Sequence, residues 1–520
     1  MNDGIILSTI NARFHHAAFG LRYIKANMEE LGPRTQMLEF TTGQGCREIA
    51  EEILRHRPRI LGLGVYIWNT RQTLDLVQTL KSLNPNLVIV LGGPEISYET
   101  ESQELYQYCD HVIVGEADFA FRDLCRALLR GDKPNKKLTP ELPNIAKITS
   151  PYQHYSESDI KNRIIYVEAS RGCPYRCEYC LSSLDKSVRS FHLESFLLDM
   201  KMLLDRGVRS FKFVDRTFNL SPRTSLSILE FFLQESHRGL FLHFEMVPDR
   251  LPQELRDIIS LFPDGSLQFE VGIQTMNPKV AERIQRRQDY SKIQDNLQFL
   301  ANRTRVHIHA DLIVGLPGES LESFGKGFDQ LAELRTHEIQ VGILKRLKGT
   351  PITRHDQDFE MVYSQIAPFQ ILQNKDLSFS EIMRLQRFAD YWDWYGNSGN
   401  FSNFIEFLRL RDAPDGTKSL FRQILELSDF LFVRFQSTHG ISLRRQFDGA
   451  YLYLIEALGV EPEIGREVLI QDYQRGGRQD FPDLLRSTSR QRGLRSQRRQ
   501  LRHSDRKGIN RSDSDQPFHR

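Results

Sequence analysis

Three of the six cysteines in this 520-residue chain, Cys173, Cys177 and Cys180, lie within eight residues. Their C-x3-C-x2-C spacing follows directly after a strand-like segment, residues 164–169. Three thiolates can hold three corners of an iron–sulfur cubane, which leaves the fourth iron without a protein ligand and open to a small molecule. The competing interpretation is a structural zinc site that uses these three cysteines and His192.

The segments that follow the cysteines predict a parallel α/β architecture. Six strand-like segments alternate with helix-like segments, as in a (β/α) barrel. A full eight-unit barrel needs roughly 250 residues, so this shorter region predicts a partial (β/α)6 barrel, over residues 163–348. Active sites in such barrels lie where strands end and loops begin. The predicted strands are residues 164–169, 210–214, 242–247, 267–271, 307–314 and 338–344.

The N-terminal region, residues 1–135, shows a similar alternation. Five strand-like and four helix-like segments predict a doubly wound, Rossmann or flavodoxin-like parallel sheet, which binds ligands at the carboxyl ends of its strands. The predicted strands are residues 4–10, 35–40, 60–65, 87–91 and 111–114, and the predicted helices are residues 17–31, 47–55, 70–83 and 117–129.

The remaining regions are simpler. Residues 136–162 are rich in proline and polar residues, which predicts a linker without elements long enough for a core. Residues 349–484 predict a mostly helical region, with a capping box at Ser378–Glu381. Its aromatic cluster, residues 391–395, favours core packing over a pocket.

The C-terminal tail, residues 485–520, is basic. Residues 486–520 hold eleven Lys and Arg and three Asp, a net charge of +8, which leaves −6 for the rest of a chain of net charge +2. Few large apolar residues predict a disordered tail, and a solvated extension is favoured over nucleic-acid contact. No apolar run reaches the length of a membrane span and no signal peptide is visible, so we expect a cytoplasmic protein without a membrane anchor.

The segment Ser170-Arg-Gly-Cys-Pro-Tyr-Arg-Cys-Glu-Tyr-Cys180 resembles the radical S-adenosylmethionine (SAM) superfamily. The family hallmark has this spacing, an aromatic residue before the last cysteine (here Tyr179), and a place after the first strand of a partial barrel. The resemblance implies a [4Fe–4S] cluster on the three cysteines, with SAM on the open iron. It also implies one-electron cleavage of SAM to methionine and a 5′-deoxyadenosyl radical, with an electron donor such as flavodoxin or ferredoxin.

The resemblance also suggests residues that contact SAM. Asp215, after the second strand, would hold the methionine amino group, although the local sequence departs from the family's Gly-Gly-Glu form. Glu270 and Gln274, in the fourth strand, would bind ribose hydroxyls. Gly315, after the fifth strand, would lie near the adenine, and it and Gly318 allow close backbone approach.

Charged residues near the predicted SAM contacts allow both a functional and a structural interpretation. Glu245, in the third strand, would be costly to bury unless it pairs with a substrate or a protein cation. One of Arg283, Arg286 and Arg287 corresponds to an arginine that faces the SAM carboxylate in relatives, but a solvated basic face is favoured.

The N-terminal region resembles the cobalamin-binding domain that precedes many radical SAM barrels. Glycines Gly92 and Gly93 would let the nucleotide tail lie against backbone. His16 is a candidate lower ligand of cobalt, but the Asp-x-His-x-x-Gly motif is missing, and a structural role for His16 is favoured. A degenerate domain without cobalamin is the alternative. The matching loops are residues 11–16, 66–69, 92–97 and 114–116.

The whole order, with a C-terminal domain of unknown function like DUF4080, resembles a group of cobalamin-type radical SAM enzymes. This resemblance implies methyl transfer to, or rearrangement of, an unknown substrate such as a small molecule. One alternative is a cobalamin-free radical SAM enzyme or a methylthiotransferase, which would need cluster ligands at Cys46, Cys109 and Cys125. A non-catalytic iron–sulfur sensor whose tail contacts nucleic acid is the other.

Overall fold

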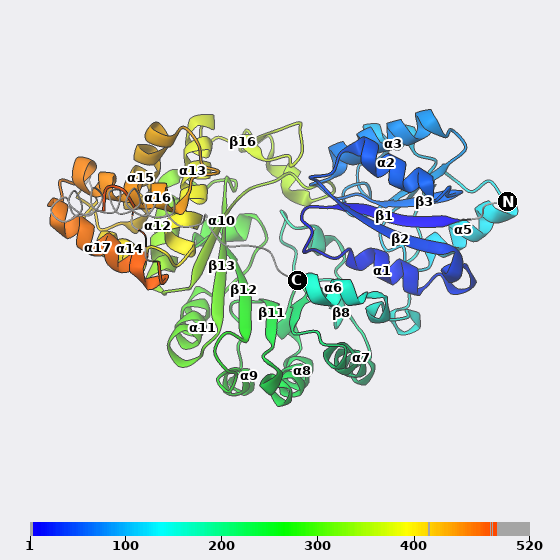
Figure 1. Cartoon of the computed structure of the whole chain (residues 1–520), viewed down its shortest axis with the longest axis horizontal. Helices are drawn as coiled ribbons and strands as arrows, with labels where there is room; N and C mark the ends of the chain where they lie inside the picture. Colours follow the sequence, from blue (N-terminus) through cyan, green and yellow to red (C-terminus); the bar gives the residue numbers. More distant parts are fainter. Residues whose placement is uncertain (1–3, 414–415, 479, 481, 486–520) are drawn as a thin grey trace, which may run out of the picture. The chain divides into compact units, whose positions relative to one another are not determined.

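The computed structural model describes residues 4–413, 416–478, 480 and 482–485 (Figure 1). The predicted basic tail, apart from Leu485, lies outside the described residues. Contacts between residues divide the chain into two units, residues 1–389 and 390–520, which we describe separately.

The first unit begins with a parallel six-stranded sheet of order β2-β1-β3-β4-β5-β6. This confirms the predicted doubly wound sheet and adds a sixth strand to it. The strands are β1 (Ile5–Asn11), β2 (Thr35–Thr41), β3 (Ile60–Gly64), β4 (Val88–Gly92), β5 (His111–Ile113) and β6 (Lys137–Leu138). The helices are α1 (Phe19–Ala26), α2 (Cys46–Arg55), α3 (Thr70–Leu83), α4 (Glu104–Tyr108) and α5 (Ala120–Arg130).

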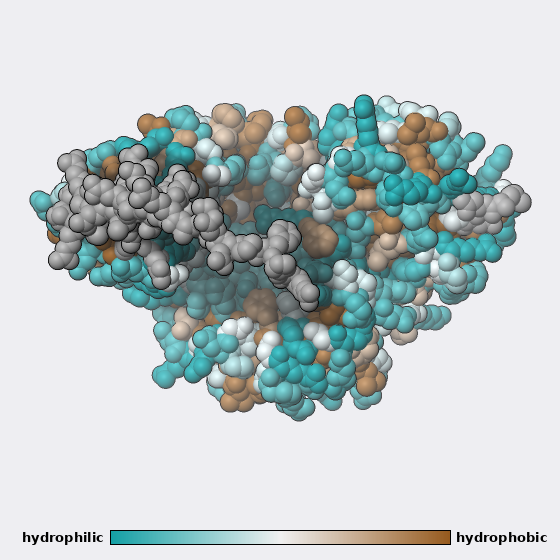
Figure 2. All heavy atoms as spheres, in the orientation of Figure 1, coloured by the Kyte–Doolittle hydropathy of each residue, from teal (hydrophilic) through white to brown (hydrophobic). Residues whose placement is uncertain are grey.

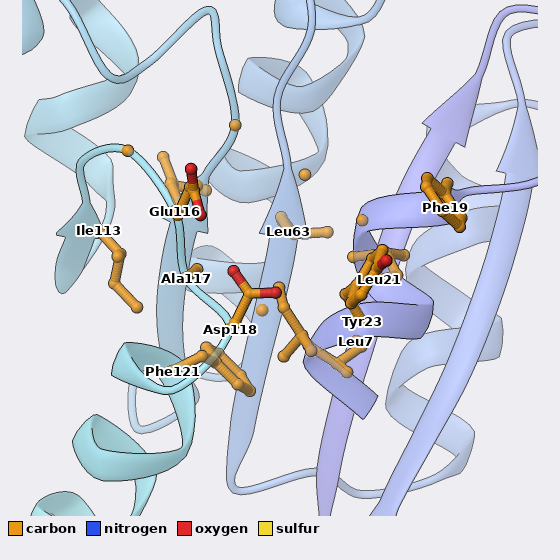
Figure 3. A pocket seen from close by; sticks show the side chains of 18 of the residues that line it. Leu7, Phe19, Leu21, Tyr23, Leu63, Ile113, Glu116, Ala117, Asp118 and Phe121 are labelled. Carbon is orange, nitrogen blue, oxygen red and sulfur yellow. The ribbon is translucent and has the colours of Figure 1, made fainter. Parts of the chain in front are cut away.

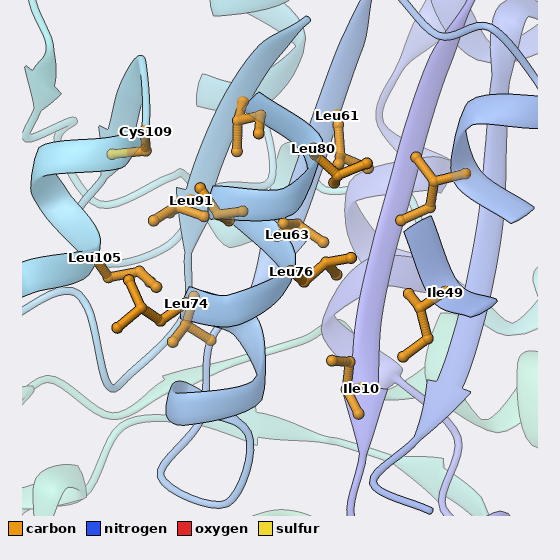
Figure 4. Close-up of a cluster of buried hydrophobic side chains, with 14 of the residues drawn as sticks. Ile10, Ile49, Leu61, Leu63, Leu74, Leu76, Leu80, Leu91, Leu105 and Cys109 are labelled. Carbon is orange, nitrogen blue, oxygen red and sulfur yellow. The ribbon is translucent and has the colours of Figure 1, made fainter. Parts of the chain in front are cut away.

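Helices cover both faces of this sheet, and each face has its own apolar core. On one face, side chains of α2 and α3 such as Ile49 and Leu76 pack against Leu61 of β3 (Figure 4). On the other face, α1 and α5 contribute Leu21 and Phe121. Burial of these side chains is the main favourable contribution to folding of the domain.

The predicted helix over residues 17–31 is shorter in the structure. α1 ends at Ala26, and a 3₁₀ helix (Glu29–Arg34) follows. The Asn27 side chain donates hydrogen bonds to Tyr23 O and Thr149 O and accepts one from Thr149 N. This side chain therefore competes with continuation of the helix and ties its end to a later segment.

The expectation that residues 136–162 hold no core-forming element is wrong. The segment contains β6, 3₁₀ helices at Ile145–Lys147 and Tyr152–His154, and α6 (Glu157–Asn162). Tyr152 and Tyr155 are fully buried, and their hydroxyls donate to Glu168 O and Tyr166 O. This segment is therefore packed structure, because its two tyrosines supply apolar area and satisfied hydroxyls.

A second parallel sheet has the order β14-β13-β12-β11-β10-β7, and its two outer strands do not pair with each other. This confirms the predicted partial barrel of six strands. The strands are β7 (Ile165–Val167), β10 (Ser210–Phe213), β11 (Phe241–Met246), β12 (Leu267–Gln274), β13 (His307–Val314) and β14 (Glu338–Ile343). The helices are α7 (Leu193–Asp205), α8 (Pro222–Gln234), α9 (Gln253–Ile259), α10 (Pro278–Arg283), α11 (Tyr290–Arg303) and α12 (Leu321–Glu333).

We expected the chain after this sheet to be mostly helical from residue 349. Its first part differs from that expectation. A 3₁₀ helix, η8 (Pro351–His355), precedes an antiparallel hairpin of β15 (Val362–Tyr363) and β16 (Ile371–Gln373). The predicted capping box is confirmed at the start of α13 (Phe379–Trp392): Ser378 N donates to Glu381 Oε2 at 2.8 Å and Glu381 N to Ser378 Oγ at 3.4 Å.

The second unit is helical, with α14 (Ser402–Arg409), α15 (Leu420–Phe435), α16 (Leu443–Leu452) and α17 (Pro462–Arg475). The aromatic cluster packs in its core, as predicted. Tyr391 and Tyr395 are buried, and their hydroxyls donate to Ser437 O and Gln446 O.

The surface in Figure 2 is mostly hydrophilic, with scattered apolar side chains. None of the helices in the described part of the chain combines the length and the apolar character needed to cross a membrane.

Candidate functional site

Cys173, Cys177 and Cys180 line one cavity of about 150 Å³ in the first unit, which we call the thiol cavity. The loops that follow strands contribute other wall residues such as Thr217 and Pro248, and the strands β11, β12 and β13 contribute side chains, as expected for a partial barrel. These side chains include Glu245, Glu270, Gln274 and Asp311, and Arg286 joins them from the segment after α10.

The three cysteines lie in a tightly folded segment, residues 171–184, which we call the cluster loop. Gly172 has a φ of +89°, and a Cβ there would lie 1.9 Å from Ser187 O, so only glycine fits. Cys173 N donates to Asp185 O at 3.0 Å, and Cys180 N donates to Cys177 O at 3.1 Å. All three thiols are free.

Arg286 places a positive charge beside these thiols. Its Nη1 lies 3.4 Å from Cys177 Sγ, and its Nη2 donates to Gly272 O. Burial raises the pKa of the Cys173 thiol, and the Arg286 charge opposes that rise. Because the thiolate is the form that binds metal, Arg286 favours the ligand state. The expected solvated basic face is therefore wrong for Arg286, although Arg287 is exposed.

The donor set fits a three-cysteine cluster. Among the described residues, no group of three or more His, Cys, Asp or Glu is arranged to hold a single metal ion. Cluster ligands bind different iron atoms, so they do not have to converge on one point. His192, the candidate fourth zinc ligand, contacts Ser195 Oγ at 3.2 Å and is not part of the cavity wall.

The inner face of the barrel is polar. Along β12 and β13, buried apolar side chains alternate with partly buried residues, which are polar except for Gly272 and Ile313. The strand register aligns Glu245 with Glu270, Glu270 with His309, and Gly272 with Asp311. Barrel interiors filled by branched apolar residues have no such polar rows. The lumen is therefore built to contact polar groups.

Most charged groups of the lumen have partners. His243 Nε2 lies 3.0 Å and Lys212 Nζ 3.4 Å from Glu270 Oε2. The hydrogen bond with His243 is the main reason that the pKa of Glu270 falls to about 2. Glu245 pairs with Arg216 Nη1 at 3.0 Å, which is the protein cation that its position called for.

Asp311 differs from these carboxylates. Its Oδ1 is buried and accepts no hydrogen bond, and His309 Nε2 is 3.6 Å away from it. Burial, with the charges of Glu270 and Glu245, raises the pKa of Asp311 well above its ordinary value. This oxygen is therefore available to a donor group in the cavity.

The structure places the predicted SAM contacts in two groups. Tyr179, Glu270 and Gln274 line the thiol cavity, and Gln274 has a left-handed φ of +70°. Asp215 and Gly315 do not line it.

The side chain of Asp215 points back into the fold. It accepts hydrogen bonds from Ala169 N at 3.0 Å and Ser170 Oγ at 2.6 Å, and burial raises its pKa to about 6. Asp215 therefore holds the residues just before the cluster loop. A Cβ at Gly315 would lie 2.6 Å from Ile371 Cγ2, so this glycine admits the hairpin strand β16.

A second cavity, of about 270 Å³, lies at the carboxyl edge of the first sheet (Figure 3). We call it the glycine-lined cavity. Its walls combine backbone with apolar side chains such as Leu63 and Phe121. A Cβ at Gly62 would lie 2.7 Å from the Phe121 ring, so the wall depends on the missing side chain. The glycines that line it are Gly20, Gly62, Gly64, Gly92, Gly93 and Gly115.

Gly92 and Gly93 line this cavity, whereas His16 does not. His16 Nδ1 lies 2.5 Å from the Tyr166 hydroxyl, and burial lowers the pKa of His16. Trp68 lies in one of the predicted matching loops, residues 66–69. Its ring stacks on Tyr66, which lines the cavity, and it is 47% exposed.

The mouth of the glycine-lined cavity is linked to the cluster loop. Arg171 Nη1 lies 2.8 Å from Glu116 Oε2 and 2.9 Å from Asp118 Oδ2, and its Nε lies 2.8 Å from Glu168 Oε1. Arg189 also pairs with Glu116. Arg171 could not be recognised from the sequence, because two of its partners, Glu116 and Asp118, are more than 50 residues away in the chain.

The cysteines of the first domain do not form a second site. Cys109 packs in the core on one face of the sheet and Cys125 in the core on the other. Cys46 lies at the start of α2 and contacts Gln72 O. A methylthiotransferase-type second cluster is therefore not favoured.

Three regions of the chain match known families. Residues 6–125 match the B12 binding domain, residues 167–331 the radical SAM superfamily, and residues 357–514 a protein family of unknown function, DUF4080. The order agrees with the order predicted from the sequence.

Curated relatives are distant. The chain is 25% identical over 342 residues to the cobalamin-dependent radical SAM methyltransferase TokK of Streptomyces tokunonensis, which covers 57% of this chain and 48% of that protein. It is also 25% identical over 299 residues to the ribosomal protein uS12 methylthiotransferase RimO of Citrifermentans bemidjiense, which covers 54% and 63%. The chain spans about half the length of the first of these relatives.

Two solved structures share the fold. The methyltransferase TsrM from Kitasatospora setae, with cobalamin and a [4Fe–4S] cluster bound, aligns with a TM-score of 0.59 at 14% identity, over 91% of this chain and 100% of that chain. The cobalamin-dependent SAM radical enzyme OxsB, with aqua-cobalamin and SAM bound, aligns with a TM-score of 0.58 at 13% identity, over 99% and 82%.

Proposed function

We propose that this chain, a member of the radical SAM superfamily that also carries a B12-binding domain, binds a [4Fe–4S] cluster on Cys173, Cys177 and Cys180 and cleaves SAM. The observation that carries this proposal is that three free thiols line one cavity beside the Arg286 guanidinium. When bound and reduced, such a cluster supplies the electron that cleaves SAM to methionine and a 5′-deoxyadenosyl radical. A flavodoxin or ferredoxin is the expected class of donor.

The residues of this chain would bind the cluster and orient SAM beside it. Arg286 stabilises negative charge on the thiolates. Glu270 is ionised at neutral pH, because its pKa is about 2, so it can accept hydrogen bonds from ribose hydroxyls. Gln274 and Tyr179 line the same wall.

We further propose that the first domain binds cobalamin. The glycine-lined cavity has apolar walls and a backbone floor at Gly92 and Gly93, which suits a flat nucleotide tail. We do not assign His16 to cobalt, because its ring is held by Tyr166 and it is not part of the cavity wall.

Methyl transfer is the reaction that the curated relatives favour, with radical rearrangement as the second candidate. The polar lumen favours a small polar substrate. A hydroxyl or ammonium group of that substrate would find the open oxygen of Asp311, where it would offset the cost of a buried unpaired carboxyl.

The test is anaerobic reconstitution with iron, sulfide and cobalamin, followed by reduction with SAM present. We expect an iron–sulfur absorbance, bound cobalamin, and 5′-deoxyadenosine. A Cys177→Ala variant should form no 5′-deoxyadenosine, while its cobalamin content stays at the level of the unaltered chain.

Each other outcome supports a different alternative. Cluster assembly without 5′-deoxyadenosine would indicate an iron–sulfur sensor. Turnover without cobalamin uptake would indicate a cobalamin-free radical SAM enzyme. Zinc at the cysteines, with no iron–sulfur absorbance, would overturn the proposed function.

A further inference from the structure

The short helix η8 (Pro351–His355) lies between two matched family regions and belongs to neither. The radical SAM match ends at residue 331 and the DUF4080 match begins at residue 357. Ile352 of this helix is fully buried and His355 is 7% exposed. A buried histidine in a linker-like segment needs a partner for its polar atoms.

Its partner is Glu178, which lies in the cluster loop between the last two cysteines. His355 Nε2 lies 2.7 Å from Glu178 Oε2, and Arg354 Nη2 lies 2.7 Å from the other carboxylate oxygen. Ile352 N donates to Glu178 O at 3.1 Å, and Glu178 N donates to Ile284 O at 3.1 Å. Both the side chain and the backbone of Glu178 are therefore held.

The burial of Glu178 gives this contact its importance. The residue is only 2% exposed, although a charged residue in a loop is usually solvated. A buried carboxylate is tolerated when cations and hydrogen bonds surround it. His355 and Arg354 therefore decide where the loop between Cys177 and Cys180 can lie.

The same part of the chain also holds the turn after β13. Arg354 Nη2 donates to Arg283 O at 3.1 Å, and Arg283 Nη1 donates to Pro317 O at 2.7 Å. A Cβ at Gly318 would lie 1.8 Å from the Arg283 guanidinium, and Gly318 N donates to Asp376 Oδ2 at 2.9 Å. These contacts connect the cluster loop with the turn through residues that follow the barrel.

We propose that His355 and Arg354 are positioning residues that hold the cluster loop through Glu178 and so set the arrangement of the three thiols. This inference rests on the proposed function, because the arrangement of the thiols matters only if they are the cluster ligands. It gives the segment after the barrel a role in building the cluster site.

The first test uses the metal-free protein. Each cysteine is alkylated with iodoacetamide and its rate is followed by mass spectrometry. In His355→Ala we expect Cys177 to react about fivefold faster, because the loop opens more often. Cys109 and Cys125, buried in the first domain, are internal controls and should keep their rates.

Two further variants separate a direct contact from general destabilisation. Glu178→Ala should raise the Cys177 rate by a similar factor, and the double variant should add little, because the two side chains form one contact. His355→Gln should recover part of the protection, since its amide can donate to Glu178. His192→Ala, an exposed histidine outside the cavity wall, should behave like the unaltered chain.

The second test uses the reconstituted protein. We expect His355→Ala to bind less iron per chain and to give an altered electron paramagnetic resonance spectrum of the reduced cluster when SAM is added, with unchanged cobalamin content. Unaltered Cys177 alkylation together with a normal cluster spectrum in this variant would overturn the inference. If the unaltered chain itself assembles no cluster, the proposed function fails, and faster alkylation in the variants would still support the loop contact.

Discussion

The guanidinium of Arg171 lies 2.9 Å from a carboxylate oxygen of Asp118, and this ion pair joins the cluster loop to the wall of the glycine-lined cavity. The two side chains are 13% and 5% exposed. Arg171 is two residues before Cys173, and Asp118 follows β5, so a contact between two domains lies next to both proposed cofactor sites.

Loss of the Arg171 guanidinium should destabilise the folded protein. Arg171→Ala leaves Glu168, Glu116 and Asp118 without their shared partner, and we expect the free energy of unfolding to fall by roughly 3–5 kcal/mol. Arg171→Lys should recover only part, because lysine cannot bind several carboxylates in the fork geometry. Urea unfolding measures both values. Arg130→Ala, which removes an exposed pair with Asp132, should cost at most about 1 kcal/mol.

Glu319 should make stability depend on pH. It is 2% exposed, Thr275 donates to it, and burial raises its pKa from 4.5 to about 7. The folded state therefore binds the Glu319 proton more tightly than the unfolded state does, which stabilises the fold. This contribution to the free energy of unfolding is complete below about pH 4.5 and is lost as pH rises through 7. The loss amounts to roughly 3 kcal/mol at most.

Glu319→Gln tests this directly, since glutamine does not titrate. The difference in unfolding free energy between the unaltered chain and the variant should move in favour of the variant between pH 5 and pH 8. Parallel pH profiles for the two proteins would contradict the assignment.

Gly92 should control cobalamin retention. A Cβ there meets no atom closer than 3.8 Å, so Gly92→Ala should fold and bind normally. Gly92→Leu would fill the cavity, and we expect its cobalamin content after reconstitution to fall by at least about tenfold, from lost complementarity in the pocket. Iron content is the control, because the thiol cavity is unaffected. An equal cobalamin content in the two variants would mean that the nucleotide tail of cobalamin binds elsewhere.

Arg286 should raise the reduction potential of the cluster. Arg286→Gln removes a positive charge beside Cys177, which destabilises the more negative reduced state. A loss of about 1 kcal/mol corresponds to a reduction potential on the order of 50 mV more negative, measured by redox titration. Arg287→Gln removes an exposed charge that lines the same cavity and should shift the potential less than Arg286→Gln, because water screens it.

Much of the fold could be predicted because its longer strands contain regularly placed apolar residues and are separated by helix-like segments. The alternation of strand-like and helix-like segments was sufficient to predict both parallel sheets. β6 was missed because a strand of two residues has no periodicity to detect. The hairpin of β15 and β16 was missed for the same reason.

The site was harder to predict than the fold. Asp215 and Gly315 follow strands, as ligand-binding residues do, but each is used inside the protein. Arg286 looked like a solvated charge because its partner, Cys177, is distant in the sequence. The polar rows of the lumen had a visible signal, the alternation of His307, His309 and Asp311 with apolar residues in one strand.

The position of β6 bears on how the first domain can be isolated. Its strand pairs with β5 through Val112 and Ile113, beyond the boundary expected at residue 135. A fragment ending there would leave the backbone donors and acceptors of β5 facing water along an open margin. Unpaired sheet edges recruit strands from other molecules, and a very short edge strand such as the two-residue β6 offers little backbone for such pairing. The shortened piece should therefore self-associate more than one extended past Leu138.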